Sequence, residues 1–180
     1  IRDFKGKKTG ELIAKKLNPS NNYIAYSSDG GLIAFAGIKG IEIRRLTGNL
    51  LKAIDFNPHS LAISHDEKMV AAVNKEEARI YSLAGTLLHR TTPPNAKDPH
   101  GSTASIAFSR DDREIAFASS ESLCIWNTSK GELKQFLGHE GWITDCAYSP
   151  DGTMIASASY DSTLRLWTSG GDPLKTLVGH

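Results

Sequence analysis

The chain has 180 residues, of which 39% are hydrophobic and 23% charged, a composition that is ordinary for a folded domain and argues against disorder. Its 21 basic and 20 acidic residues give a net charge of +1, without the basic run that would follow a nucleic-acid backbone. The apolar runs are far too short to span a bilayer, and no secretion signal opens the sequence. We therefore expect no nucleic acid and no membrane as partners, and a cytoplasmic location.

The sequence offers little material for an enzyme or a metal site. Cys124 and Cys146 have no CxxC spacing, so we expect free thiols in a reducing compartment. The chain contains no P-loop, no HExxH, no GxGxxG and no Cys/His spacing typical of metal ligands. We therefore expect no cofactor, no metal and no catalytic residue.

Four segments repeat one pattern along the chain, at residues 24–45, 61–81, 106–126 and 146–167. Each contains a short apolar strand, a polar turn (SSDG, SHDE, SRDD or SPDG), a second strand, another turn and a third strand of alternating character. A turn and a fourth strand follow, as in TGNLLKAI. The residues that end the first strands, Tyr26, Ile63, Phe108 and Tyr148, are spaced 37, 45 and 40 apart. The spacing predicts a four-stranded unit repeated about every forty residues.

In chain order, the pattern predicts an incomplete unit followed by four complete ones. Residues 1–17 align with the third and fourth strands of a later unit, so they are expected to be outer strands of a preceding, incomplete sheet. The complete units are expected at 18–55, 56–92, 99–138 and 139–180. The long spacing between the second and third units indicates an insertion at 89–104, which is either a solvated protein-binding loop or disordered.

A lone four-stranded antiparallel sheet cannot bury both of its faces, so such units stack around an axis as the blades of a propeller. The last unit, with GH at 138–139, SPDG at 149–152, ASASYD at 156–161, LRLW at 164–167 and a second GH at 179–180, resembles a WD40 repeat. The resemblance is strong there, recognisable in the third unit and weak in the first two. It implies an all-β, WD40-like propeller segment of about four blades, similar to repeats of bacterial arrays that follow a signalling NTPase or kinase.

WD40 propellers usually close with about seven blades, so four blades imply an incomplete ring with exposed sheet edges. Exposed edges pair readily with other strands. Three explanations are open: further sequence, another chain that completes the ring, or two copies that close on each other.

A histidine, a serine and an aspartate in the last unit could form a hydrolase triad or a structural network. The resemblance implies the second, a hydrogen-bonded network of His139, Ser157, Asp161 and Trp167 inside the blade. The chemistry agrees, because these groups can satisfy one another's donors and acceptors when buried. A catalytic serine would need an exposed hydroxyl near oxyanion donors, whereas Ser157 lies in the middle of an expected strand without a GxSxG turn.

The other units lack this network by position. The matching residues are Pro99 or His100, Phe117, Glu121 and Trp126 in the third unit, Ala72, Glu76 and Tyr81 in the second, and Phe35, Lys39 and Arg44 in the first. An arginine at a tryptophan position has a second interpretation, namely that the alignment of the first unit is shifted by one residue.

Partner binding in WD40 proteins uses positions at one end of the blades, and the resemblance places Trp142, Thr144 and Tyr160 there. Matching residues in the other units are Ser102, Ala104 and Ser120, then Asn57, His59 and Lys75, then Ser20, Asn22 and Ile38. The aromatic pair has the character of an interface hot spot. We expect a non-catalytic scaffold or sensor module in signalling that binds a protein or peptide. The alternatives are an enzyme with its active site in the channel and an architectural segment that completes another chain's ring.

Overall fold

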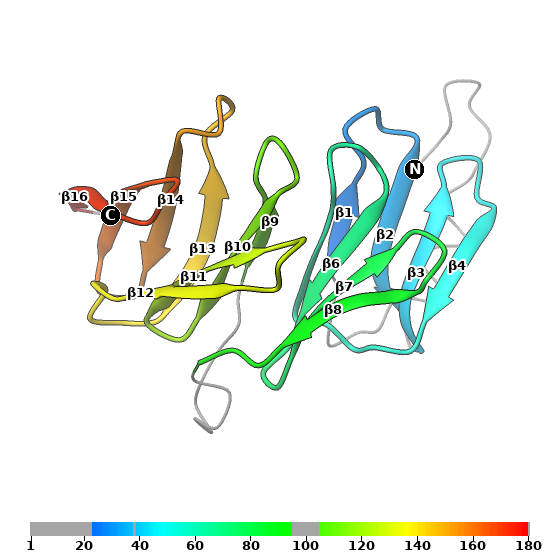
Figure 1. Ribbon diagram of the computed structural model, residues 1–180, viewed down its shortest axis with the longest axis horizontal. Coiled ribbons are helices and arrows are strands. Elements are labelled where there is room, and N and C mark those ends of the chain that lie inside the picture. Colours follow the sequence, from blue (N-terminus) through cyan, green and yellow to red (C-terminus); the bar gives the residue numbers. More distant parts are fainter. Residues whose placement is uncertain (1–22, 38, 95–104, 180) are drawn as a thin grey trace.

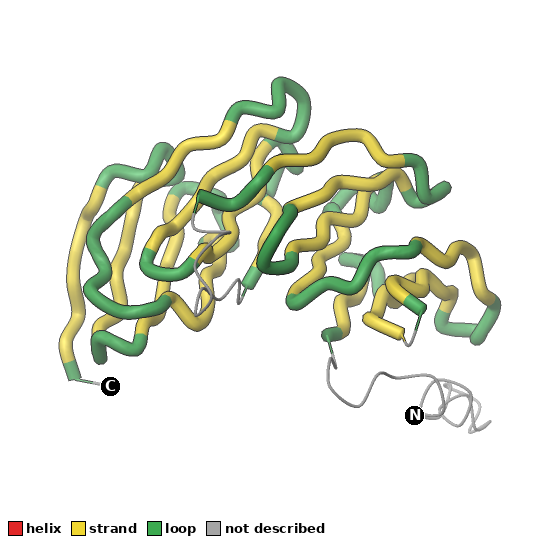
Figure 2. The backbone as a smooth tube through the Cα atoms, turned by 90° about the horizontal axis from the view of Figure 1, so that it is seen from below, coloured by secondary structure: helices red, strands yellow, loops and turns green. Residues whose placement is uncertain are grey.

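Four antiparallel sheets follow one another along the chain, each built from four consecutive strands joined by hairpins (Figure 1). The computed structural model describes residues 23–37, 39–94 and 105–179, and within them all regular structure is β-strand. The all-β class and the four four-stranded sheets that the repeats predict are thereby confirmed. The sheets stand side by side along an arch, which does not close within the described residues (Figure 2).

The strands of the first two sheets fall within residues 18–55 and 56–92. The first sheet has β1 (Ile24–Tyr26), β2 (Leu32–Gly37), β3 (Gly40–Arg45) and β4 (Leu50–Ile54). The second has β5 (Ser60–Ile63), β6 (Met69–Val73), β7 (Ala78–Ser82) and β8 (Leu87–Thr91). Residues 89–91, which the sequence assigned to the inserted loop, therefore belong to β8. Most of that loop, and residues 1–17, lie outside the described residues.

The third sheet has β9 (Ile106–Phe108), β10 (Glu114–Ser119), β11 (Ser122–Asn127) and β12 (Leu133–Phe136). The fourth has β13 (Ile143–Tyr148), β14 (Met154–Ser159), β15 (Thr163–Thr168) and β16 (Pro173–Val178). Strand pairing also settles the alignment of Arg44. Ile33 pairs with Arg44 as Ile155 pairs with Trp167, so Arg44 occupies the tryptophan position of its sheet without a shift.

Three apolar clusters lie between neighbouring sheets and join them. The alternation of side chains along each strand sends one set of residues to each neighbour. In the third sheet, Phe117 and Trp126 pack against the second sheet, whereas Ala116 and Leu123 pack against the fourth. The second and third sheets therefore each turn a face with larger side chains to the sheet before and a face with smaller ones to the sheet after.

The fourth sheet has one half-open face. Ala156, Ala158, Leu164 and Leu166 are only partly buried, and they occupy the positions of Ala116, Ala118, Leu123 and Ile125, which are buried in the third sheet. In the described part of the chain, no further sheet covers this face.

The turn between the first and second strands has the same hydrogen bonds in all four sheets. In the fourth sheet the Ser149 hydroxyl donates to Asp151 at 2.5 Å and accepts from the Met154 amide at 2.9 Å. Ser27, Ser64 and Ser109 make the matching pairs of bonds. Hydrogen bonds from the Ser149 hydroxyl and from the amide and hydroxyl of Thr153 lower the pKa of the Asp151 carboxyl to about 2. The polar S-x-D turns of the sequence are thus the hairpins that set strand register.

Candidate protein-binding face

The end of the sheets that carries the turns between second and third strands is called the top face here, and the opposite end the bottom face. Beneath the top face of the fourth sheet, four side chains form one hydrogen-bonded chain. The Trp167 indole Nε1 donates to the Ser157 Oγ at 2.9 Å. That hydroxyl lies 2.8 Å from His139 Nε2, and His139 Nδ1 lies 2.8 Å from Asp161 Oδ2. The structure thus brings together all four residues of the expected network.

The polarity of the chain follows from its ends. Trp167 can only donate and an ionised Asp161 can only accept, so the bonds run from indole to hydroxyl to imidazole to carboxylate when His139 is neutral with its proton on Nδ1. Burial acts to raise the pKa of Asp161. Hydrogen bonds from the Thr163 hydroxyl, from His139 and from the Glu140 amide outweigh burial and hold the pKa well below its usual value.

This arrangement does not suit a catalytic triad. Ser157 is only 1% exposed, and its hydroxyl is enclosed between the indole of Trp167 and the imidazole of His139. A nucleophilic serine needs an exposed oxygen that a substrate can approach. The network therefore braces the sheet by tying the segment before β13 to β14 and β15.

Among the described residues, the matching positions of the other sheets do not form this network; Pro99 and His100, the expected counterparts of His139 in the third unit, lie outside them. Phe117 stands in place of Ser157, and the buried indole Nε1 of Trp126 has no hydrogen-bond partner. The hairpin that carries Asp161 is also one residue longer than its counterparts, because Ser157 pairs with Arg165 whereas Phe117 pairs with Cys124. Glu121 and Glu76, which the sequence aligned with Asp161, are exposed. Arg44 instead bonds Glu42 and the Gly48 carbonyl.

Trp142 and Tyr160 lie together on the top face of the fourth sheet. Their ring centroids are 6.5 Å apart at an interplanar angle of 68°, an edge-to-face contact, and the Tyr160 amide donates to the Trp142 carbonyl at 3.0 Å. Trp142 is 36% and Tyr160 is 75% exposed. Thr144, also exposed, donates its hydroxyl to the Ala158 carbonyl at 3.3 Å. The fourth sheet therefore presents an ordered aromatic pair to solvent.

The other expected contact residues differ in exposure. Asn57 and Lys75 are exposed on the second sheet, and His59 is partly buried there. Burial lowers the pKa of His59, and the charge of Lys75 lowers it further. Ser120 is only 4% exposed, which counts against it as a partner contact. The remaining five expected contact residues lie outside the described part of the chain: Ser20, Asn22, Ile38, Ser102 and Ala104.

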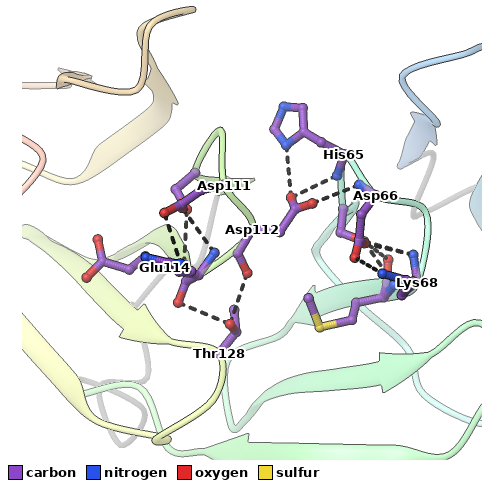
Figure 3. A network of polar contacts seen from close by, with 11 residues as sticks. His65, Asp66, Lys68, Asp111, Asp112, Glu114 and Thr128 are labelled. Atoms are coloured by element: carbon purple, nitrogen blue, oxygen red, sulfur yellow. Dashed lines mark hydrogen bonds and ion pairs between the residues drawn. The ribbon is translucent and has the colours of Figure 1, made fainter.

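A polar contact between the second and third sheets was not predicted from the sequence. Asp112 accepts bonds from the His65 and Asp66 amides at 2.8 Å each, and its carboxylate lies 2.9 Å from His65 Nδ1 (Figure 3). The Asp112 carbonyl accepts from the Thr128 hydroxyl at 2.9 Å. The signal in the sequence that could have indicated this contact is the aspartate at position 112, where the matching turns of the first and fourth sheets have glycine. Asp112 fastens two adjacent turns of the bottom face.

A small cavity of about 260 Å³ lies on the bottom face between the third and fourth sheets. Its walls include Arg110, Glu114 and the two turn aspartates Asp111 and Asp151, both of which are already hydrogen-bonded within their turns. Burial raises the pKa of Tyr148, whose hydroxyl has no hydrogen-bond partner there. These groups form no acid–base pair with a nucleophile.

The two cysteine thiols lie in the interior of the sheets. Cys124 and Cys146 are free and buried, and burial raises the pKa of each thiol to about 12. Across the described ranges, no three His, Cys, Asp or Glu side chains gather in a way that could hold a metal ion. None of the residues that the structure describes forms a helix long and apolar enough to cross a membrane.

The fold and the buried network define a class of protein, a β-propeller built from repeated blades. Comparison with known proteins gives the family. The model of the WD domain, G-beta repeat, matches residues 130–168, the stretch that contains the aromatic pair and all four residues of the network. Residues 130–168 are therefore a WD40 repeat, and the four four-stranded sheets are those of a WD40-like propeller segment.

Three relatives illustrate how widely this repeat is used. The chain is 25% identical over 150 residues to the transcriptional corepressor LEUNIG_HOMOLOG of Arabidopsis thaliana, covering 82% of this chain and 18% of the relative. It is 34% identical over 68 residues to a guanine nucleotide-binding protein subunit beta of Schizosaccharomyces pombe (37% and 22%). It is 40% identical over 75 residues to the protein transport protein SEC13 of Chaetomium thermophilum (37% and 24%). The chain spans less than a quarter of the length of each of them.

Proposed function

We propose that this chain is a non-catalytic scaffold module that binds a protein or peptide through the top face of its fourth sheet. The observation that carries the proposal is the exposed edge-to-face pair of Trp142 and Tyr160. Tryptophan and tyrosine supply large contact areas with a polar group, and few side chains contribute more to protein interfaces. The relatives, which are named for a corepressor, a G-protein subunit and a transport protein, share the repeat rather than one reaction.

The network below the pair supports this function. Asp161, directly after Tyr160, is held by His139, Thr163 and the Glu140 amide. The segment from Glu140 to Trp142 is thereby tied to the hairpin that carries Tyr160, and so both rings are held before a partner arrives. A surface held in its binding conformation loses less entropy on association.

The experiment compares capture of partners by the wild-type chain and by the double variant Trp142→Ala/Tyr160→Ala. Both proteins are immobilised, exposed to a lysate of the source organism, and the retained proteins are identified, purified and titrated. We expect the double variant to bind the purified partner at least about tenfold more weakly. Met154→Ala is the matched control, since Met154 is similarly exposed (38%) but lies at the opposite end of the sheet. Equal affinity of wild type and double variant would contradict the proposal.

A second candidate function is supported by the half-open face of the fourth sheet. Ala156, Ala158, Leu164 and Leu166 match residues that the third sheet buries beneath its neighbour. We propose that a second copy of the chain covers this face and extends the arch toward a ring. The driving force is burial of apolar area of the same kind that joins the described sheets.

A further inference from the structure

The segment that carries Trp142 and Tyr160 is acidic. Residues 138–163 include no lysine and no arginine, although they contain four acidic residues. Asp161 and Asp151 of these four are already bound within the network and the bottom-face turn. The other two, Glu140 and Asp145, are exposed on either side of Trp142 in the chain.

The third sheet adds a carboxylate to the same place. The Ile143 amide donates to the Ser120 carbonyl at 2.8 Å, so the turn between β10 and β11 lies against the start of β13. Glu121, the next residue of that turn, is exposed. Three exposed acidic residues from two sheets therefore belong to segments that carry or adjoin the aromatic pair: Glu140 just before Trp142, Asp145 within β13, and Glu121 in the turn that contacts the start of β13.

The basic side chain in the upper half of the fourth sheet is directed elsewhere. The Arg165 Nη1 and the Trp167 ring both lie close to Gly138, and the Arg165 Nε is buried. Arg165 therefore lies against the interior of the sheet and does not offset the exposed carboxylates in the way that a solvent-exposed guanidinium would.

Resting on the proposed function, we propose that the partner inserts a lysine or arginine side chain at Trp142 and Tyr160. In an edge-to-face pair one ring keeps its own faces free, and the face of an aromatic ring attracts a cation. Glu121, Glu140 and Asp145 complement the positive charge, and the aliphatic part of the side chain covers the rings. An acidic partner would instead bring like charges together.

The test selects peptides from a random library displayed on phage, with the wild-type chain as bait and the Trp142→Ala chain for counter-selection. Peptides that depend on Trp142 are expected to contain lysine or arginine more often than the starting library does. The selected peptides are then synthesised and titrated against the triple variant Glu121→Gln/Glu140→Gln/Asp145→Asn, whose amides keep the size of the acids. We expect about threefold to tenfold weaker binding at low salt, and a smaller difference as salt is raised.

The control is Glu132→Gln, which removes an exposed carboxylate from the opposite end of the third sheet and should leave affinity unchanged. Circular dichroism and thermal unfolding check that every variant is folded. Peptides that depend on Trp142 but lack basic residues, or that bind the triple variant as well as the wild type, would overturn this inference and leave the proposed function standing. If no selected peptide depends on Trp142, the result contradicts both this inference and the proposed function.

Discussion

The Ser157 hydroxyl oxygen joins two halves of the buried network, because it lies within hydrogen-bonding distance of both Trp167 and His139. Each of the four side chains has its polar group satisfied by its neighbours, which is the condition for burying such groups without a large cost. The third sheet shows the opposite case, since the Trp126 indole is buried without an acceptor opposite Phe117. The fourth sheet therefore carries polar stabilisation that the third replaces with apolar packing.

Asp161→Ala should lower the free energy of unfolding by about 1 to 3 kcal/mol, because His139, Thr163 and the Glu140 amide lose their acceptor. Asp161→Asn should cost less, since the amide keeps one oxygen. Urea unfolding followed by circular dichroism measures both. An unchanged midpoint in the alanine variant would count against a stabilising role of the network.

The same residue predicts a pH dependence. The pKa of Asp161 is lower in the folded than in the unfolded chain, where it is near 3.8. Its contribution to stability is therefore complete above the unfolded value and is lost as pH falls through the folded value. The stability advantage of wild type over Asp161→Asn should be constant near neutral pH and shrink below about pH 4. An advantage that grows on acidification would contradict this assignment.

At the scale of elements, the turns of the bottom face share one backbone conformation. Gly30, Glu67, Asp112 and Gly152 occupy the same turn position with φ of 72°, 59°, 58° and 74°. Glycine adopts this left-handed region freely, whereas other residues do so at a cost. Asp112 adopts this less favourable backbone conformation, and its carboxylate accepts hydrogen bonds from two amides in the turn of the second sheet (Figure 3).

Three substitutions at Asp112 should separate the two effects. Asp112→Ala loses the carboxylate and keeps the left-handed backbone, so it should destabilise the chain most, by about 2 to 3 kcal/mol. Asp112→Gly loses the carboxylate but relieves the backbone, and should cost less. Asp112→Asn should cost least, because asparagine tolerates this backbone and retains an oxygen. Thermal unfolding gives the order, and a glycine variant no more stable than the alanine variant would refute it.

The strands could be predicted from the sequence because apolar and polar residues alternate along it with a period of two, which is also the period with which side chains alternate between the two faces of a strand. The alternation of LRLW and the S-x-D turns predicted strands and hairpins in every unit, and pairing shows them there. The length of the hairpin around Asp161 was not predicted. A fixed offset from Ser157 hides one additional residue, although the distance along the sequence to the next tryptophan, 157 to 167 against 117 to 126, already contains it, as the strand register shows. Burial of Ser120 likewise depends on the neighbouring β13, which a single repeat does not disclose.

At the scale of the whole molecule, the arch leaves one face of the fourth sheet without a neighbour among the described residues (Figure 2). The sequence predicted an incomplete ring from the number of repeats, and the open arch confirms it. The covering of the open face is a matter of association, which depends on surface rather than on strand pattern. The repeats therefore predicted that the ring needs completing but left open whether further sequence, another chain or a second copy completes it.

Light scattering on the purified chain tests whether a second copy covers that face. We expect the wild type to form dimers or larger species, because partly exposed Leu164 and Leu166 would be buried between copies. Leu166→Asp should shift the population to monomers by placing a charge in the contact. Leu137→Glu is the control, since Leu137 is 73% exposed at the end of the third sheet. A wild-type chain that stays monomeric at its highest soluble concentration would contradict the proposal.

The difference between the two faces of each sheet has a consequence for how such a molecule can grow. The contact between successive sheets is head-to-tail: Phe117 and Trp126 of the third sheet meet the second, and Ile155 and Trp167 of the fourth meet the third. Because the two contacting faces differ, each sheet that is added leaves a free face to which another sheet can be added. The series stops only when the curvature of the arch brings the last sheet against the first. A gene duplication that inserts one more repeat would therefore add a unit whose two sides already match its neighbours, with no compensating substitution required in either.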